Sequence, residues 1–218
     1  MRMTKTVLTI TGVFWGMVLL SAPSYAIARE KTAAPPVMPQ AQELKLTLRE
    51  LWSGHIFWVR NVVLATKYGD ALAAKVAEDQ VVQNAKDIAG SIGPYYGKEA
   101  SDKLFGLLAG HYGAIKEYMT AGFAGKKEGK DAAVEKLKKN ADEIAAFLST
   151  ANPNWKKETL LSALMTHAGH HIAQIDAIAA KDFSSEAPVW HAMKKHVYVI
   201  ADVLADGIVK QFPMKFGK

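Results

Sequence analysis

The sequence predicts an all-α fold, an antiparallel bundle of about six long helices, and three observations lead to this expectation. Apolar residues recur at helical spacing from about residue 40 almost to the end of the 218-residue chain, and no segment has the pattern of a strand. Half of the residues are apolar and 22% are charged, which suffices for a buried core. Glycine, proline and asparagine interrupt the helical pattern at residues 69–70, 93–97, 125–129 and 152–154, and a further break falls at residues 181–185. These breaks leave helices of roughly 22–28 residues, each about 33–42 Å long.

The first 26 residues have the layout of a secretory signal peptide. Arg2 and Lys5 precede an apolar stretch, and small residues lead to Ala26. The apolar stretch has about 15 residues, fewer than the roughly 20 that span a bilayer. We expect cleavage after Ala26, with Ala28 as the alternative site and an uncleaved membrane anchor as the alternative role. The pattern predicts an exported protein, periplasmic or extracellular, with no stable membrane span after cleavage.

Residues 27–40 form a proline-rich linker, and residues 41–216 form the predicted bundle domain. The formal net charge is +6, and removal of Arg2 and Lys5 with the signal peptide leaves +4. This mild excess, without an arginine-rich strip that carries aromatic residues, makes nucleic acid an unexpected partner. The chain contains no cysteine, which excludes disulfides, thiolate metal sites and cysteine nucleophiles.

The bundle domain contains a predicted threefold repeat. Residues 41–96, 97–152 and 153–208 align without a gap at a period of 56 residues. The alignment superposes His55, His111 and His167, three of the seven histidines of the chain. At one equivalent position in the second half of the units, the first two units have asparagine and the third has histidine. We therefore expect three related helical hairpins.

Equal distances from the turns place these polar residues at one height. If six helices run side by side, these polar residues form one layer across the middle of the bundle. The predicted layer contains His55, Asn84, His111, Asn140, His167 and His196. The alternative architecture is a four-helix bundle with an attached hairpin, in which part of the layer converges.

The histidines of the layer predict a transition metal site. His55, His111 and His167 lie on apolar helix faces, and His171 follows His167 by one turn. His196 is level with His167 on the neighbouring helix. Imidazole suits zinc, copper, iron and nickel, so the predicted ion is one of these, with bis-histidine haem as a minor alternative. His170 and His191 are expected to point away from this site.

Four further residues are candidate hydrogen-bond partners of the ligands. Asn84 and Asn140 lie in the layer, and Asp87 and Glu143 follow them by one turn. These side chains would orient the histidines by hydrogen bonds, and the alternative is that Asp87 and Glu143 are charges on the helix surface. Arg60 is predicted either to contact a buried anion or to extend to the surface.

The leading functional hypothesis is an exported carrier or sensor of a metal ion. The first alternative is a non-enzymatic structural or interaction protein, in which hydrogen-bonded histidines and asparagines fix the packing and the partner is another envelope protein. Phosphate loops, nucleophile elbows, His-Glu-x-x-His and Glu-x-x-His patterns do not occur in the sequence. The sequence therefore does not decide whether the protein is an enzyme, although it favours a binding role.

Motifs along nearly the whole mature chain resemble a family of exported or membrane-anchored bacterial helical proteins. The family has no established role and is often mislabelled as glycosyltransferases. The similar segments are Leu51-Trp52-x-x-His55-x-x-Trp58-x-Arg60, Pro94-Tyr95-Tyr96-Gly97, residues 140–149, Asn152-Pro153-Asn154-Trp155, residues 201–208 and residues 211–216. The resemblance implies a helical envelope protein and no particular reaction.

Residues 167–174 resemble the metal-binding signature of the DinB-like bundles. In that family a His-x-x-x-His pair and a third histidine from an earlier helix bind a divalent metal. The resemblance implies that His167 and His171 bind a metal with His55 or His111. Some members are thiol-dependent transferases, which gives a third hypothesis, a metal-dependent transferase. Ala173 stands where the family usually has glycine.

Overall fold

The computed structural model describes residues 40–217, and the predicted signal peptide and almost all of the linker lie outside these residues. The described residues form six α-helices and a terminal 3-10 helix, without a strand. The prediction of an all-α bundle is therefore confirmed. The helices are α1 (Gln40–Tyr68), α2 (Ala71–Gly90), α3 (Gly93–Phe123), α4 (Lys127–Ala151), α5 (Lys157–Ala180), α6 (Phe183–Gln211) and η1 (Pro213–Phe216).

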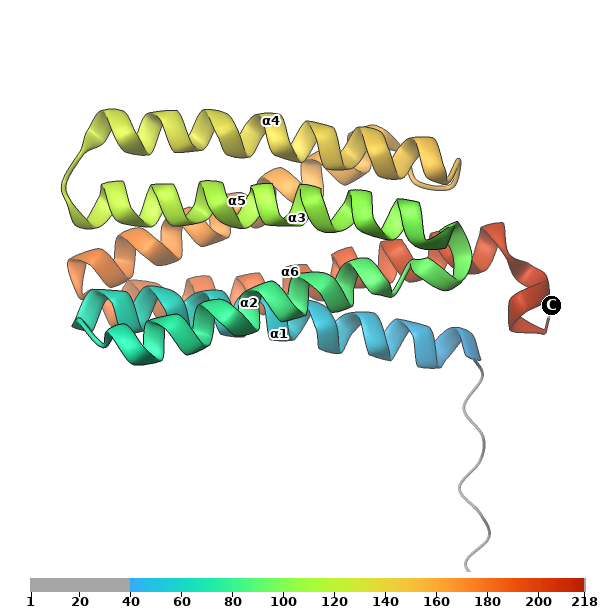
Figure 1. The fold of residues 1–218 in the computed structure, drawn as a ribbon, viewed down its shortest axis with the longest axis horizontal. Coiled ribbons are helices and arrows are strands. Elements are labelled where there is room, and N and C mark those ends of the chain that lie inside the picture. The colour runs from blue at the N-terminus through green and yellow to red at the C-terminus, as the bar shows by residue number, and fades with distance from the viewer. Residues whose placement is uncertain (1–39, 218) are drawn as a thin grey trace, which may run out of the picture. The chain divides into compact units, whose positions relative to one another are not determined.

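The six helices form one closed bundle. Each helix packs against its neighbours in the chain, and α6 closes the ring by packing against α1. Consecutive helices run in opposite directions (Figure 1). Helix α5 also contacts both α1 and α3. Helix α5, from the third predicted hairpin, thus contacts one helix from each of the other two hairpins.

The turns between helices lie where the sequence predicts breaks. Gly69 and Gly125 adopt positive φ, and the side chains of Asp70 and Asp182 cap the first turns of α2 and α6. The predicted break at residues 93–97 takes a different form, because α3 begins at Gly93 and only kinks at Gly97. Helix α3 therefore has 31 residues and α2 has 20, and α1 and α6 have 29 each, all outside the expected range of lengths.

A polar layer divides the apolar core into two clusters. On α3, for example, Leu104 and Leu108 belong to one cluster and Ile115 and Tyr118 to the other, and His111 lies between them. The second cluster fills the end near the turns at Gly69, Gly125 and Lys181. The same order of apolar, polar and apolar residues holds on α1, α2, α4 and α5.

Each hairpin contains the same contact between its two helices. A polar side chain on the second helix donates a hydrogen bond to a backbone carbonyl on the first, always 33 positions earlier in the chain. The three pairs are Asn84 with Leu51 at 2.9 Å, Asn140 with Leu107 at 2.9 Å, and His196 with Ala163 at 2.8 Å. These contacts follow the 56-residue period, and the common origin of the three hairpins stays a prediction.

Glycines accompany the two asparagine contacts. A Cβ atom at Gly54 would lie 3.1 Å from Nδ2 of Asn84, and one at Gly110 would lie 3.3 Å from Nδ2 of Asn140. The third hairpin has Thr166 at this position and the longer side chain of His196 opposite. Short asparagines are therefore combined with glycine, and a longer histidine with threonine.

Among the helices of residues 40–217, none combines the length and apolarity needed to span a membrane.

Candidate metal centre

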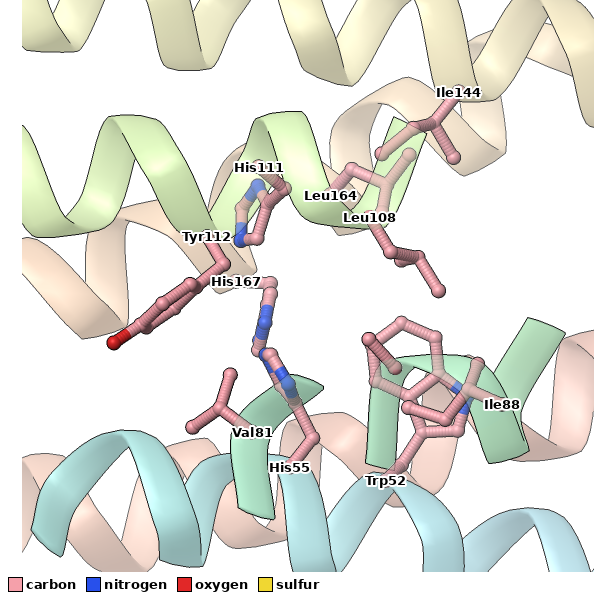
Figure 2. Close-up of a pocket in the computed structure, with 11 residues that line it drawn as sticks. Trp52, His55, Val81, Ile88, Leu108, His111, Tyr112, Ile144, Leu164 and His167 are labelled. Atoms are coloured by element: carbon pink, nitrogen blue, oxygen red, sulfur yellow. The ribbon is translucent and has the colours of Figure 1, made fainter. Parts of the chain in front are cut away.

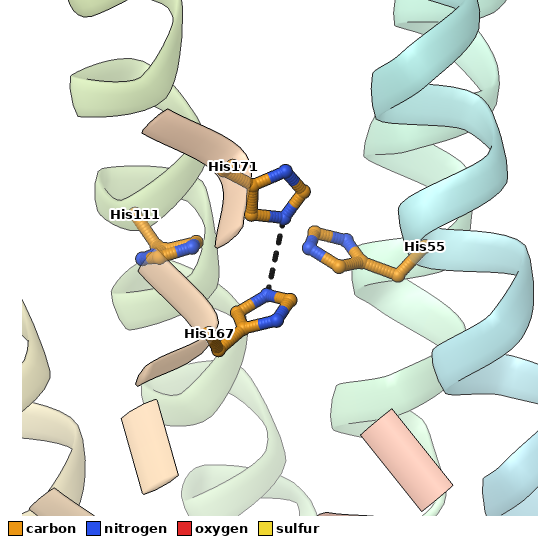
Figure 3. Close-up of side chains that lie close together, drawn as sticks. All are labelled: His55, His111, His167 and His171. Atoms are coloured by element: carbon orange, nitrogen blue, oxygen red, sulfur yellow. Dashed lines mark hydrogen bonds between the residues drawn. The ribbon is translucent and has the colours of Figure 1, made fainter. Parts of the chain in front are cut away.

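Four histidine side chains meet in the polar layer (Figure 3). His55 comes from α1, His111 from α3, and His167 and His171 from α5. All four are buried, with at most 6% of any residue exposed. His167 and His171 are one helical turn apart and share the face of α5 that contacts α1 and α3. The inward position of α5 therefore brings the cluster together.

The ring nitrogens converge on one point. One nitrogen from each ring lies within 4.8 Å of the nitrogens offered by the other three. The Nε2 atoms of His167 and His171 are 3.2 Å apart and share a hydrogen bond. The His55 ring lies 5.4 Å from the His167 ring and 5.5 Å from the His171 ring between centroids. No carboxylate belongs to this group of potential ligands within the described chain.

These distances suit a four-coordinate metal ion. Bonds of about 2.0–2.1 Å in tetrahedral geometry place two ligand nitrogens about 3.3 Å apart. The His167–His171 separation of 3.2 Å is close to this value. The widest separation, 4.8 Å, must close by about 1.5 Å, a distance within reach of side-chain rotation. The donor set and its size therefore fit an ion held by three helices.

Burial lowers the pKa of all four histidines. Desolvation and the nearby His111 bring the pKa of His55 to about 3. Desolvation brings the pKa of His111 to about 4, and the neighbouring Asn140 side chain opposes this shift. Desolvation and repulsion from the other imidazoles hold the pKa of His167 and His171 well below the usual value. All four rings are therefore neutral at pH 7, the form that binds metals.

Several buried atoms of the cluster have no hydrogen-bond partner. They include Nε2 of His55 and His111 and Nδ1 of His167 and His171. Buried polar atoms in native proteins are almost always paired, so unpaired atoms in one cluster point to a missing partner. A metal ion between the rings would accept the lone pairs of His55 and His111.

Trp52 and Tyr112 border the histidines (Figure 2). The Trp52 ring contacts the His55 and His167 rings edge to face, with centroids 5.9 and 5.8 Å away. A cavity of about 10 Å³, lined by both aromatic residues and by His55, His111 and His167, lies beside the cluster. Its size corresponds to about one water molecule. One molecule of the size of water therefore has a place next to the imidazoles.

Three histidines lie outside the cluster. His196, a predicted ligand, donates to the carbonyl of Ala163 and lies against His170, with ring centroids 5.5 Å apart. Its helix, α6, packs against α1 and α5, and its ring engages the Ala163 carbonyl and His170 instead of the other four rings. His170 is half-buried and His191 is exposed, in agreement with the expectation for both.

The four predicted partners of the ligands fall into two pairs. Asn84 and Asn140 are buried in the layer, where each bonds to a backbone carbonyl rather than to an imidazole. Asp87 and Glu143 are exposed, and they interact with Gln83 and Lys139 of their own helices. The carboxylates of Asp87 and Glu143 therefore do not hydrogen-bond to the histidines, because their positions on α2 and α4 face solvent.

A buried ionic network next to the cluster was not predicted as a whole. Arg60 donates two hydrogen bonds to Glu186, at 2.7 and 3.0 Å, and Gln174 donates a third at 2.8 Å. Glu186 is 3% exposed, and Arg60 lowers the pKa of its carboxyl group. Gln174 Oε1 and His171 Nδ1 are both unpaired one turn apart on α5. An amide oxygen there is complementary to an imidazole N–H, which would orient His171.

Searches against protein families, curated proteins and solved structures returned no match to this chain. The two resemblances described above therefore stay predictions.

Proposed function

We propose that the protein binds one transition metal ion through His55, His111, His167 and His171 and acts as an exported carrier or sensor of that ion. The observation that carries the proposal is the convergence of four buried, neutral imidazoles from three helices to within 4.8 Å. Zinc, copper, iron and nickel suit such ligands. The signal-peptide pattern of residues 1–26 supports export.

The composition of the cluster favours binding over catalysis. A hydrolase or transferase needs an acid or base beside the metal, and the grouped ligands of the described chain are all histidines. The nearby buried carboxylate, Glu186, is already held by Arg60 and Gln174. A carrier or a sensor requires the four imidazoles alone.

Hydrogen bonding supports a ligand site over a structural layer. Asn84, Asn140 and His196 already connect the helices of the three hairpins by bonds to backbone carbonyls. The four clustered histidines add one mutual hydrogen bond and leave both Nε2 atoms of His55 and His111 unpaired. A layer selected only for packing would pair these atoms.

The decisive experiment is the elemental metal content of untagged, mature protein purified from its native compartment. The test variant carries His55→Ala, His111→Ala and His167→Ala. The matched control carries alanine at the three histidines outside the cluster, His170, His191 and His196. Circular dichroism confirms that each variant is folded.

We expect near-stoichiometric metal in the wild type and in the control, and none in the folded test variant. The same metal content in the wild type and the test variant would contradict the proposal. Metal-free native protein would favour the structural alternative, and the search would move to protein partners in the envelope.

A further inference from the structure

A second, larger cavity lies in the bundle beside the histidine cluster. It has a volume of about 70 Å³ and apolar walls formed by all six helices. Its lining includes Leu104, Leu108, Leu148, Leu160 and Leu204. Well-packed cores seldom contain voids of this size, and an apolar cavity of about 150 Å³ is known to accept benzene. A cavity of half that volume suits a smaller apolar guest.

The cavity reaches the surface between α5 and α6. Val199, which is 53% exposed, and Thr159, which is also exposed, belong to its lining. Ala163 and Val203 lie at the same seam and are half-buried. A small molecule can therefore enter between these two helices without separating the whole bundle.

Trp52 separates this cavity from the histidines. It lines both cavities, together with Ile88, Leu108, Ile144 and Leu164. Its Nε1 atom is buried and has no hydrogen-bond partner. In Figure 2 this nitrogen lies on the side of the ring toward Ile88 and away from the histidines. A guest in the larger cavity that carries an acceptor would pair this donor.

We infer that this cavity is a binding site for a small, neutral and mainly apolar molecule with one hydrogen-bond acceptor, which pairs with Trp52 Nε1. A guest of about four or five heavy atoms fits the volume. The apolar lining excludes charged molecules, because nothing in the cavity compensates a buried charge. The site does not depend on the proposed metal, although its guest lies one side chain away from the histidines.

The test uses two probes of matched shape, 2-butanone and 2-methylbutane, which differ in the acceptor oxygen. Binding is followed by methyl and indole resonances in NMR titrations of chelator-treated and of metal-loaded protein. Shifts are expected at Ile88, Ile92 and Ile200 of the cavity lining, and not at Ile175 and Ile178 of the other core cluster.

Both probes are expected to bind saturably with or without metal, and 2-butanone alone shifts the Trp52 indole N–H resonance. Trp52→Phe keeps an aromatic ring and removes the donor, so the affinity for 2-butanone falls about 3- to 10-fold while that for 2-methylbutane is unchanged. Equal losses for both probes would overturn the role of the indole nitrogen.

Two variants test the location of the site. Ala163→Leu fills the cavity, and Val199→Phe blocks its mouth from an exposed position that tolerates substitution. Each is expected to weaken both probes at least tenfold in a folded protein. Unchanged affinity in the folded Val199→Phe and Ala163→Leu variants, or no saturable shift in the wild type, would overturn the proposal. Because binding is measured after chelation, its failure is distinct from failure of the metal proposal.

Discussion

Two polar clusters of this bundle differ in how completely their atoms are paired. At the turn between α4 and α5, Asn152 donates to the Tyr96 hydroxyl and accepts two hydrogen bonds from Asn154. Tyr96 in turn donates to Gln211, and the Trp155 indole donates to the carbonyl of Val203. The histidine cluster is more deeply buried, yet it contains one mutual hydrogen bond and several unpaired nitrogens. The side chains of the first cluster pair with one another and with a backbone carbonyl, whereas the second has unpaired nitrogens for which the proposed metal ion would be the partner.

The largest expected effect is loss of stability in acid through the histidine cluster. The pKa of His55 is about 3 and that of His111 about 4 in the folded protein, against about 6.5 in the unfolded chain. The unfolded state therefore binds more protons below pH 6.5, and stability falls as the pH decreases from there toward these folded values. Each neutral histidine costs at most about 1.4 kcal/mol per pH unit, and about 1 kcal/mol between pH 6.5 and pH 5.5, so the four together remove several kcal/mol over this range.

Urea denaturation of chelator-treated protein at several pH values measures this loss. The control variant without His170, His191 and His196 should keep most of the pH dependence. Equal free energies of unfolding at pH 7 and pH 5.5 would contradict the assignment of four neutral, buried imidazoles.

A substitution in the fully paired cluster should have the next largest effect. A Cβ atom at Gly207 would overlap the Trp155 indole, which is 2% exposed and hydrogen-bonded in place. We expect Gly207→Ala to lower the free energy of unfolding by about 3 kcal/mol, because neither the ring nor α6 can move without loss of contacts. Gly106→Ala, at an exposed helical glycine with no neighbour within 4 Å, is the control and should be neutral or slightly stabilising. Similar stability of both variants would refute rigid packing at this turn.

A bound metal ion should supply the partner that the histidine nitrogens lack, and so stabilise the folded protein. An ion that binds the folded state stabilises it by about 2.7 kcal/mol when its free concentration is a hundred times the dissociation constant. Thermal denaturation with added metal and with chelator should therefore differ by several degrees. The variant with His55→Ala, His111→Ala and His167→Ala should melt at the same temperature in both conditions. A shift of equal size in that variant would place the metal elsewhere.

The smallest effect concerns the contacts that connect the two helices of each hairpin. Gly54→Thr should destabilise the protein by about 1 kcal/mol, since the added atoms crowd Asn84. Gly54→Thr combined with Asn84→His reproduces the Thr166 and His196 pair of the third hairpin. In a double-mutant cycle, we expect the second substitution to recover part of the loss, with a coupling of about 0.5–1 kcal/mol. Purely additive effects would argue against equivalent contacts in the three hairpins.

Repetition in the sequence predicted the core of the candidate site. Equal spacing of His55, His111 and His167 indicated one layer, and helical spacing added His171. Spacing gives the height of a residue but not the direction in which its helix faces, which is why His196 was also expected in the cluster. Its position depends on how α6 packs against α5.

Contacts between distant segments were beyond the reach of sequence patterns. Arg60 and Glu186 are 126 positions apart, and no local motif connects them. Trp52 is typical of a core aromatic residue in sequence, and its unpaired Nε1 is evident only once the surrounding helices are in place. The helix count and most turns were predictable because glycine, proline and asparagine act locally.

The most direct test of the metal site is an anomalous-difference map from crystals of the native-source protein, recorded at the absorption edge of the metal found in it. We expect one peak between the four imidazoles, within about 2.0–2.1 Å of a ring nitrogen from each of His55, His111, His167 and His171. A peak at His170 and His196, or metal-free crystals of a folded protein with the four rings unchanged, would contradict it.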